Sequence, residues 1–127
     1  MNELIQKISK DPYAEFLGIS FDEIKEGFAV CSLTIHKNSF NFLGAVHGGL
    51  IFSLADAAFS AASNFDYSPS FALDISGSFL KSPKLGDRLK AEAKLIHTTR
   101  RTGLYNIQVF HNQELIAVFN GTVFRKI

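Results

Sequence analysis

A single acidic residue lies in a long apolar stretch of the sequence. Asp56 is the only formally charged side chain in residues 38–65, and alanines flank it on both sides. Burying an unpaired carboxylate is costly, so such a residue usually has a partner, a raised pKa or a chemical role. A carboxylate of this kind can act on water as a general base or attack a carbonyl as a nucleophile. The alternative is a solvated stripe shared with Ser53, Ser60 and Ser63, and the pattern favours neither.

Two glycines, Gly48 and Gly49, follow His47 and begin the helical part of the same stretch. Glycine lets another group approach the backbone closely, and the first N–H groups of a helix have no partner inside it. With the positive end of the helix dipole, such groups stabilise negative charge developing on a carbonyl oxygen. The alternative is that the glycines only permit close packing at the helix start, and the two explanations remain open.

Three elements are expected to position these residues. Residues 2–10 have apolar side chains at helical spacing and predict a short helix, which stops at Asp11-Pro12. Residues 19–25 and 28–36 predict a hairpin. Residues 48–64 predict one long helix, because apolar side chains recur there at intervals of three and four. These side chains are Leu50, Ile51, Leu54, Ala55, Ala58, Phe59 and Ala62.

About four strands are predicted after the long helix. Turn signals at 83–86, 100–103 and 111–113 divide this part of the chain, and 114–125 supply the last strand. In residues 88–95 apolar and charged side chains alternate, which predicts one buried and one wet face. The expected fold is α+β, with an antiparallel sheet wrapped around one long central helix.

Length, charge and composition exclude several classes of protein. The 127 residues suit one domain, 1–127, and the net charge of +1 lacks the basic surplus of a nucleic-acid binder. The sequence has neither an uncharged membrane span nor a signal-peptide core, so we expect a cytoplasmic protein without membrane contact. The lone Cys31 is expected to be buried in a strand, and His36, His97 and His111 lack metal-site spacing, so no metal is expected.

Several motifs follow one another from residue 41 onward. They are Asn41-x-x-Gly44-x-x-His47-Gly48-Gly49, then Phe52-Ser53-Leu54-Ala55-Asp56, Asn64, Phe79-Leu80, Pro83, Leu85-Gly86-Asp87 and Thr102-Gly103-Leu104-Tyr105. Together they resemble the phenylacetyl-CoA thioesterase (PaaI-like) group of hot-dog proteins. The resemblance covers most of the chain from about residue 16.

This resemblance implies hydrolysis of an aryl- or fatty acyl-CoA thioester to free acid and CoA, at sites shared across a dimer interface. Asp56 would be the general base or the nucleophile, and the Gly48 amide would polarise the carbonyl. His47 and Asn41 would shape that pocket, and Asn41 would also help to position the carbonyl or the water. Coenzyme A would be part of the substrate, so no cofactor is expected. Further substrate contacts are implied for Gly49, Ser60, Lys81, Arg100 and Arg101, although a solvated turn explains the basic residues equally well.

The spacing of Asp56 and Gly48 argues for more than one subunit. Eight residues separate them, which is about 12 Å along a helix at 1.5 Å per residue. They cannot both contact one carbonyl from the same chain. We therefore expect an obligate homodimer or larger assembly, with antiparallel helices from the two subunits at each site. Separately from this spacing, a homotetramer is expected.

One departure from the thioesterase pattern and two alternative functions stay open. Related thioesterases often place a Ser or Thr on the strand after the helix to orient water, and Ala72 stands there, so Ser70, Ser76 or Ser60 would have to substitute. A non-catalytic acyl-CoA-binding protein would need no acid at Asp56. A hot-dog dehydratase would resemble a different pattern, with a His on its own loop.

Overall fold

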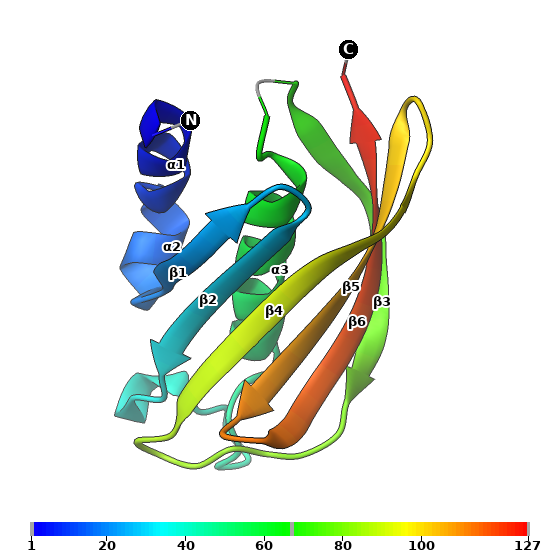
Figure 1. The fold of residues 1–127 in the computed structure, drawn as a ribbon. Coiled ribbons are helices and arrows are strands. Elements are labelled where there is room, and N and C mark those ends of the chain that lie inside the picture. The colour runs from blue at the N-terminus through cyan, green and yellow to red at the C-terminus, as the bar shows by residue number, and fades with distance from the viewer. Residues whose placement is uncertain (1, 67, 127) are drawn as a thin grey trace.

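A six-stranded antiparallel sheet packs against one face of a long helix (Figure 1). The computed structural model describes residues 2–66 and 68–126. Its helices are α1 (Asn2–Ser9), α2 (Pro12–Leu17) and α3 (Gly48–Ser63), with a 3-10 turn at Lys37–Ser39. Its strands are β1 (Ser20–Lys25), β2 (Phe28–Thr34), β3 (Ser70–Phe79), β4 (Arg88–Thr98), β5 (Thr102–His111) and β6 (Glu114–Arg125). The predicted hot-dog architecture is confirmed.

The strand order, β1-β2-β4-β5-β6-β3, leaves β3 at one edge of the sheet. After α3 the chain enters β3, which pairs only with the last strand, β6, from Ser70 opposite Arg125 to Phe79 opposite Ala117. The helices α1 and α2 lie beside the β1 edge, and β3 lies at the far side of α3 (Figure 1). Within residues 2–66 and 68–126, one long edge of β3 therefore has no strand beside it.

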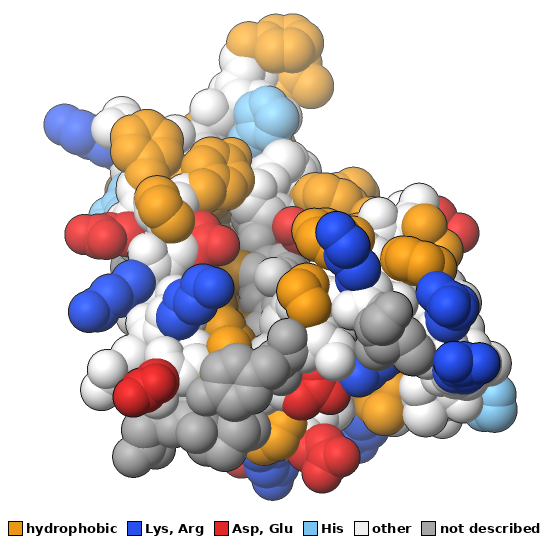
Figure 2. Space-filling model, turned by 90° about the horizontal axis from the view of Figure 1, so that it is seen from above, with side chains coloured by type: hydrophobic (Ala, Val, Ile, Leu, Met, Phe, Trp, Pro, Cys, Tyr) orange, Lys and Arg blue, Asp and Glu red, His pale blue; other side chains and the backbone are white. Residues whose placement is uncertain are grey.

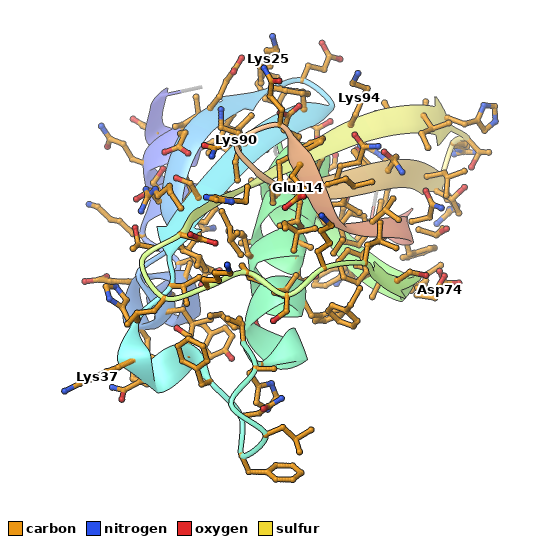
Figure 3. All side chains as sticks on the ribbon, turned by 90° about the horizontal axis from the view of Figure 1, so that it is seen from below. Lys25, Lys37, Asp74, Lys90, Lys94 and Glu114 are labelled. Atoms are coloured by element: carbon orange, nitrogen blue, oxygen red, sulfur yellow. The ribbon has the colours of Figure 1, made fainter. Side chains whose placement is uncertain are left out.

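The core lies between α3 and the inner face of the sheet. Alanines on α3 and on β4 allow the helix to approach the strands closely, and the alternation predicted for 88–95 is confirmed. Figure 3 shows Lys90 and Lys94 of β4 among the side chains outside this core. Phe59 fills the centre, where an added Cβ at Gly121 would lie 2.7 Å from its Cζ.

Two local features concern sequence predictions. Cys31 is fully buried on β2, as predicted, and burial raises the pKa of its thiol to about 12, with the charge of Asp22 adding to the effect. Asp11-Pro12 does end α1, but it also begins α2, a helix that the sequence prediction missed. The Asp11 carboxylate accepts a hydrogen bond from Ala14 N at 3.0 Å, and proline suits the first position of a helix.

The long helix matches its prediction closely. α3 begins at Gly48, as expected, and ends at Ser63, where Asn64 forms its C-cap. The 40–46 turn before α3 stands out from the body of the molecule (Figure 3). No helix within residues 2–66 and 68–126 combines the length and the apolar character needed to cross a bilayer.

Candidate active site

The first turn of α3 leaves one backbone N–H free. His47 caps the helix: its Nδ1 accepts a hydrogen bond from Gly49 N at 2.9 Å, and its carbonyl oxygen accepts one from Leu50 N at 3.0 Å. Gly48 N has no acceptor among residues 2–66 and 68–126. Because Nδ1 accepts, the neutral His47 ring carries its proton on Nε2. The cap therefore leaves the Gly48 N–H available to an outside acceptor.

Gly48 lies in a hollow between the 40–46 turn and the end of β3. This hollow has a volume of about 360 Å³, and Ala45, Val46, Ile51 and Phe79 are among the residues around it. An added Cβ at Gly48 would lie 3.3 Å from Phe79 Cζ. Glycine at this position thus keeps the approach to its amide open.

Asn41 holds the 40–46 turn in shape. Its Oδ1 accepts hydrogen bonds from Leu43 N at 2.9 Å and from Ala45 N at 3.1 Å, and its own N–H donates to Ala45 O at 2.8 Å. The carbonyl oxygen of this side chain is therefore occupied within the turn, and only its amide nitrogen remains to contact a substrate. The role predicted for Asn41 beside a reacting carbonyl stays a prediction.

Asp56 is half-buried on α3, between two small cavities. One, of about 210 Å³, opens toward the start of β3 and includes Ser70 and Ala72. The other, of about 80 Å³, lies beneath α2 and includes Asp11 and Ser53. Burial raises the pKa of the Asp56 carboxyl, and the negative charge of Asp11 raises it further. No hydrogen bond or ion pair to Asp56 occurs within the described residues.

The solvated-stripe explanation of Asp56 holds only in part. Ser60 is exposed, whereas Ser53 is half-buried and Ser63 is buried against the sheet. Ser60 also lines both cavities that contain Asp56. The Asp56 carboxyl therefore faces enclosed space as well as solvent.

A larger cavity of about 700 Å³ lies between α2, the 3-10 turn and the start of α3. Tyr13 and Ser53 line both this cavity and the small one beneath α2, so the two are neighbours along one face of α3. The face runs from Gly49 to Asp56. The sequence did not predict this cavity because it did not predict α2, which supplies three of the apolar side chains that line it. Its apolar lining residues are Tyr13, Phe16, Leu17, Phe40 and Leu50.

The predicted basic residues do not come together in one chain. Lys81 lies beyond the end of β3, where its N–H donates to Ile116 O and its amine pairs with Glu114. Arg100 and Arg101 lie in the β4–β5 turn, next to the other end of β6. The residues of β6 that they contact, Ile116 and Arg125, are nine residues apart, which is about 30 Å at 3.3 Å per residue. Basic side chains are spread around this face of the molecule and do not form one patch in the view (Figure 2).

Known proteins are similar to this chain in sequence and in fold. Acyl-coenzyme A thioesterase PaaI of Escherichia coli is 37% identical over 112 residues, which are 87% of this chain and 80% of that protein. The structure of the E. coli PaaI protein from the phenylacetic acid degradation operon covers 97% of this chain and 91% of its own, with a TM-score of 0.92 and 33% identity. A variant of phenylacetic acid degradation protein PaaI from Thermus thermophilus is 35% identical, with a TM-score of 0.87, and covers 91% and 99% of the two chains.

A family model gives the same result. Residues 43–118, from the turn before α3 to the middle of β6, match the thioesterase superfamily. The matched part contains the free Gly48 amide, Asp56 and the strands β3, β4 and β5. The chain therefore belongs to the thioesterase superfamily and is a thioester hydrolase.

Proposed function

We propose that the protein hydrolyses the thioester bond of an aryl- or fatty acyl-CoA, giving the free acid and CoA. One observation carries the proposal: α3 combines a free N–H at Gly48 with a half-buried carboxyl of raised pKa at Asp56. An amide donor suits a developing oxyanion, and a carboxyl with a raised pKa suits proton transfer. The name of the E. coli relative supports acyl-CoA as the substrate class.

In the proposed reaction Asp56 is a general base. The thioester carbonyl oxygen accepts a hydrogen bond from Gly48 N–H, and Asp56 takes a proton from water as the water oxygen bonds to the carbonyl carbon. The C–S bond then breaks, and the proton passes from Asp56 to the departing sulfur, so that acid and thiol form and Asp56 is ionised again. The cavity of about 210 Å³ beside Asp56 has room for the water.

In this proposal the Gly48 amide and the Asp56 carboxyl of one site come from different subunits. β3 runs antiparallel to α3: an added Cβ at Gly48 approaches Phe79, and Asn64 accepts a hydrogen bond from Ser70 N at 2.8 Å. A second copy pairing along the free edge of β3 by a two-fold axis would place the two α3 helices antiparallel. For the partner's Asp56 to lie level with Gly48, the two-fold axis must pass midway between the positions of Gly48 and Asp56 along α3. These residues are about 12 Å apart, so the axis lies about 6 Å from Phe79, the residue of β3 beside Gly48. That is about two residues along β3, near Gly77.

Exposed side chains on β3 support this dimer. Large apolar side chains are more than half exposed on or just beyond this strand, and exposed apolar groups on a free edge favour pairing with another chain. Pairing of two such dimers into a tetramer remains a prediction. The exposed apolar residues are Phe71, Leu73, Phe79 and Leu80.

The acyl group would enter the cavity of about 700 Å³ under α2. Its walls are mostly aromatic and aliphatic, and His47 and Gly49 lie at the end nearest the helix start. An apolar cavity of this size suits an aromatic ring or an aliphatic chain. The proposal thus places the thioester carbonyl at the start of α3 and the acyl group beside Tyr13 and Phe16.

The test is release of free thiol from a panel of aryl- and fatty acyl-CoAs by wild type and Asp56→Asn. We expect turnover by wild type and a fall in kcat of about 10²–10⁴-fold in the variant, because the amide cannot accept the proton. Equal thermal unfolding of the two proteins serves as the control. Binding of acyl-CoA without thiol release, or full activity in Asp56→Asn, would contradict the proposal.

A single turnover in ¹⁸O-labelled water separates the two roles of the carboxylate. For a general base, the label appears directly in the product acid. If Asp56 were the nucleophile, its attack would release the thiol and form a mixed anhydride. Water attack at the Asp56 carbon of this anhydride would then give a first product with an unlabelled oxygen from the carboxylate and leave the label on the protein.

A further inference from the structure

Two large apolar side chains project into solvent from the turn before α3. Phe42 is 94% exposed and Leu43 is 77% exposed. Figure 3 shows this turn projecting from the start of α3, away from the strands that carry Lys90 and Lys94. Exposed apolar side chains that lie together mark a contact surface. We propose that Phe42 and Leu43 of each subunit cover a cavity of the partner and complete the wall of its Asp56 site, an inference that rests on the proposed dimer and thioesterase site.

The backbone of this turn is held in place by its own hydrogen bonds. Besides the bonds of the Asn41 side chain, Gly44 N donates to Asn41 O at 3.0 Å. Gly44 has a φ of +80°, and Phe40 forms a β-bridge with Val46. A segment that is ordered before it binds loses little conformational entropy on contact. The turn therefore presents its two exposed side chains in a fixed position.

The turn lies beside the edge at which two copies are proposed to pair. Residues of the turn and of the end of β3 line one hollow of about 360 Å³, among them Ala45, Val46, Phe79 and Leu80. Phe79 and Leu80 are more than half exposed. The turn thus continues the apolar edge of β3, and a partner strand laid along that edge would run past it.

The two-fold arrangement places the turn level with the last part of the partner's α3. In the proposed dimer Gly48 is level with the partner's Asp56, and the two helices run in opposite directions. Ser60 is four residues beyond Asp56, which is about 6 Å along the helix. The partner's Ser60 therefore lies about 6 Å beyond Gly48, on the side from which the 40–46 turn enters α3.

A cavity of about 470 Å³ lies beside Ser60, between α1, β1 and the end of α3. Ser60 also lines both small cavities at Asp56, so the three spaces adjoin. The charged residues around the larger space, Lys7, Lys10, Asp11 and Asp66, are exposed, so an apolar group can enter without burying a charge. The partner's turn would close one side of the space between Asp56 and the partner's Gly48. The apolar residues that line the cavity are Leu4, Ile8, Pro12, Phe21, Ala57 and Pro69.

A disulfide between two introduced cysteines tests the contact without reference to activity. Leu43→Cys/Ser60→Cys should become a covalent dimer under mild oxidation, because the two positions face each other across the proposed interface. No such bond can form within one chain, since Leu43 precedes a helix in which Gly48 and Ser60 are about 18 Å apart, and a disulfide needs Cα atoms within about 7 Å. Cys31 is buried and does not interfere. The matched control, Leu43→Cys/Glu26→Cys, has its second cysteine in the exposed β1–β2 turn and should stay a single chain.

Kinetics test whether the contact forms part of the site. In Leu43→Ser, KM for acyl-CoA should rise about tenfold, the effect of losing most of one apolar contact, with kcat changed less than about twofold. The reason is that the turn would line the bound substrate without contributing a group that reacts. The assay uses a concentration at which sedimentation shows the same assembly as wild type. Ile96→Ser is the matched control: Ile96 is 54% exposed, but β5 and β6 separate its strand from β3, so KM should not change.

The two measurements can each overturn the proposal. Absence of the cross-link in Leu43→Cys/Ser60→Cys would do so, whether the protein sediments as a dimer or as a single chain. A wild-type KM in Leu43→Ser would also do so, because the turn would then lie outside the site. Failure of the proposed function is distinguishable: a cross-link in a protein that releases no thiol would keep the contact and remove only the thioesterase activity.

Discussion

Replacing Gly48 by proline removes the free amide hydrogen without removing the helix. Proline is favoured at the first position of a helix, and His47, with φ −63° and ψ 127°, already has the extended conformation that a residue before proline requires. The new ring would approach Phe79, whose side chain is 53% exposed and can move aside. The substitution is therefore expected to fold.

The expected loss follows from the role of one donor to an oxyanion. Losing such a donor costs about 2.7–4 kcal/mol, so kcat should fall by about 10²–10³-fold. Gly48→Ala is the matched control, since it has a similar contact with Phe79 but retains the N–H, and it should lose much less activity. Thiol release measures both variants, and nearly wild-type kcat in Gly48→Pro would refute the assignment of the amide.

Mixing subunits tests whether the site is shared. In a hybrid of Gly48→Pro and Asp56→Asn chains, one of the two sites has both wild-type residues if they come from different chains. Random mixing of equal amounts makes half of the dimers hybrids, so about a quarter of wild-type activity should return. If Gly48 and Asp56 acted from the same chain, no dimer would contain an intact site and activity would not return.

Three further predictions concern charge and packing. Asp11→Asn removes the negative charge beside Asp56, so the pKa of Asp56 should fall and the acidic limb of the pH–rate profile should move to lower pH; an unmoved limb would contradict this. At pH 8 about one Cys31 thiol in 10⁴ is ionised, given its pKa of about 12, so a thiol reagent should label it only in denaturant, and rapid labelling of the native protein would count against its burial. Phe59→Ala should lower the free energy of unfolding by about 3–5 kcal/mol in urea titrations, whereas a loss under about 1 kcal/mol would mean that the core closes around the gap.

Local patterns in the sequence predicted most of the elements correctly. The long helix and the alternating strands depend on side chains close together in the chain, and both were identified within a few residues. Asp11-Pro12 was harder to interpret, because the same pair can end one helix and begin another. The missing α2 also concealed the cavity that it covers.

The alternation of side chains along β3 does not by itself predict which of its residues point toward α3. Ile75, Gly77 and Phe79 pair with inward residues of β6, and strict alternation would then place residue 73 inward. A bulge between Ala72 and Asp74 shifts the register and turns Ala72 and Ser70 toward α3 instead. This irregularity explains why the sequence could not decide between Ser70 and Ser76 on this strand. The separation of Lys81 from Arg100 and Arg101 was equally hidden, since it depends on which strands become neighbours.

The position of β3 in the sheet also has a consequence for synthesis on the ribosome. β3 leaves the ribosome directly after α3, yet its partner in the sheet, β6, is made only after β4 and β5. Until then, both edges of β3 lack a neighbouring strand, while the Asn64 contacts to Ser70 span only six residues and can form early. The cavity wall beside Asp56 can thus take shape in the nascent chain, but the edge proposed to join two subunits is completed only after β6 has been made.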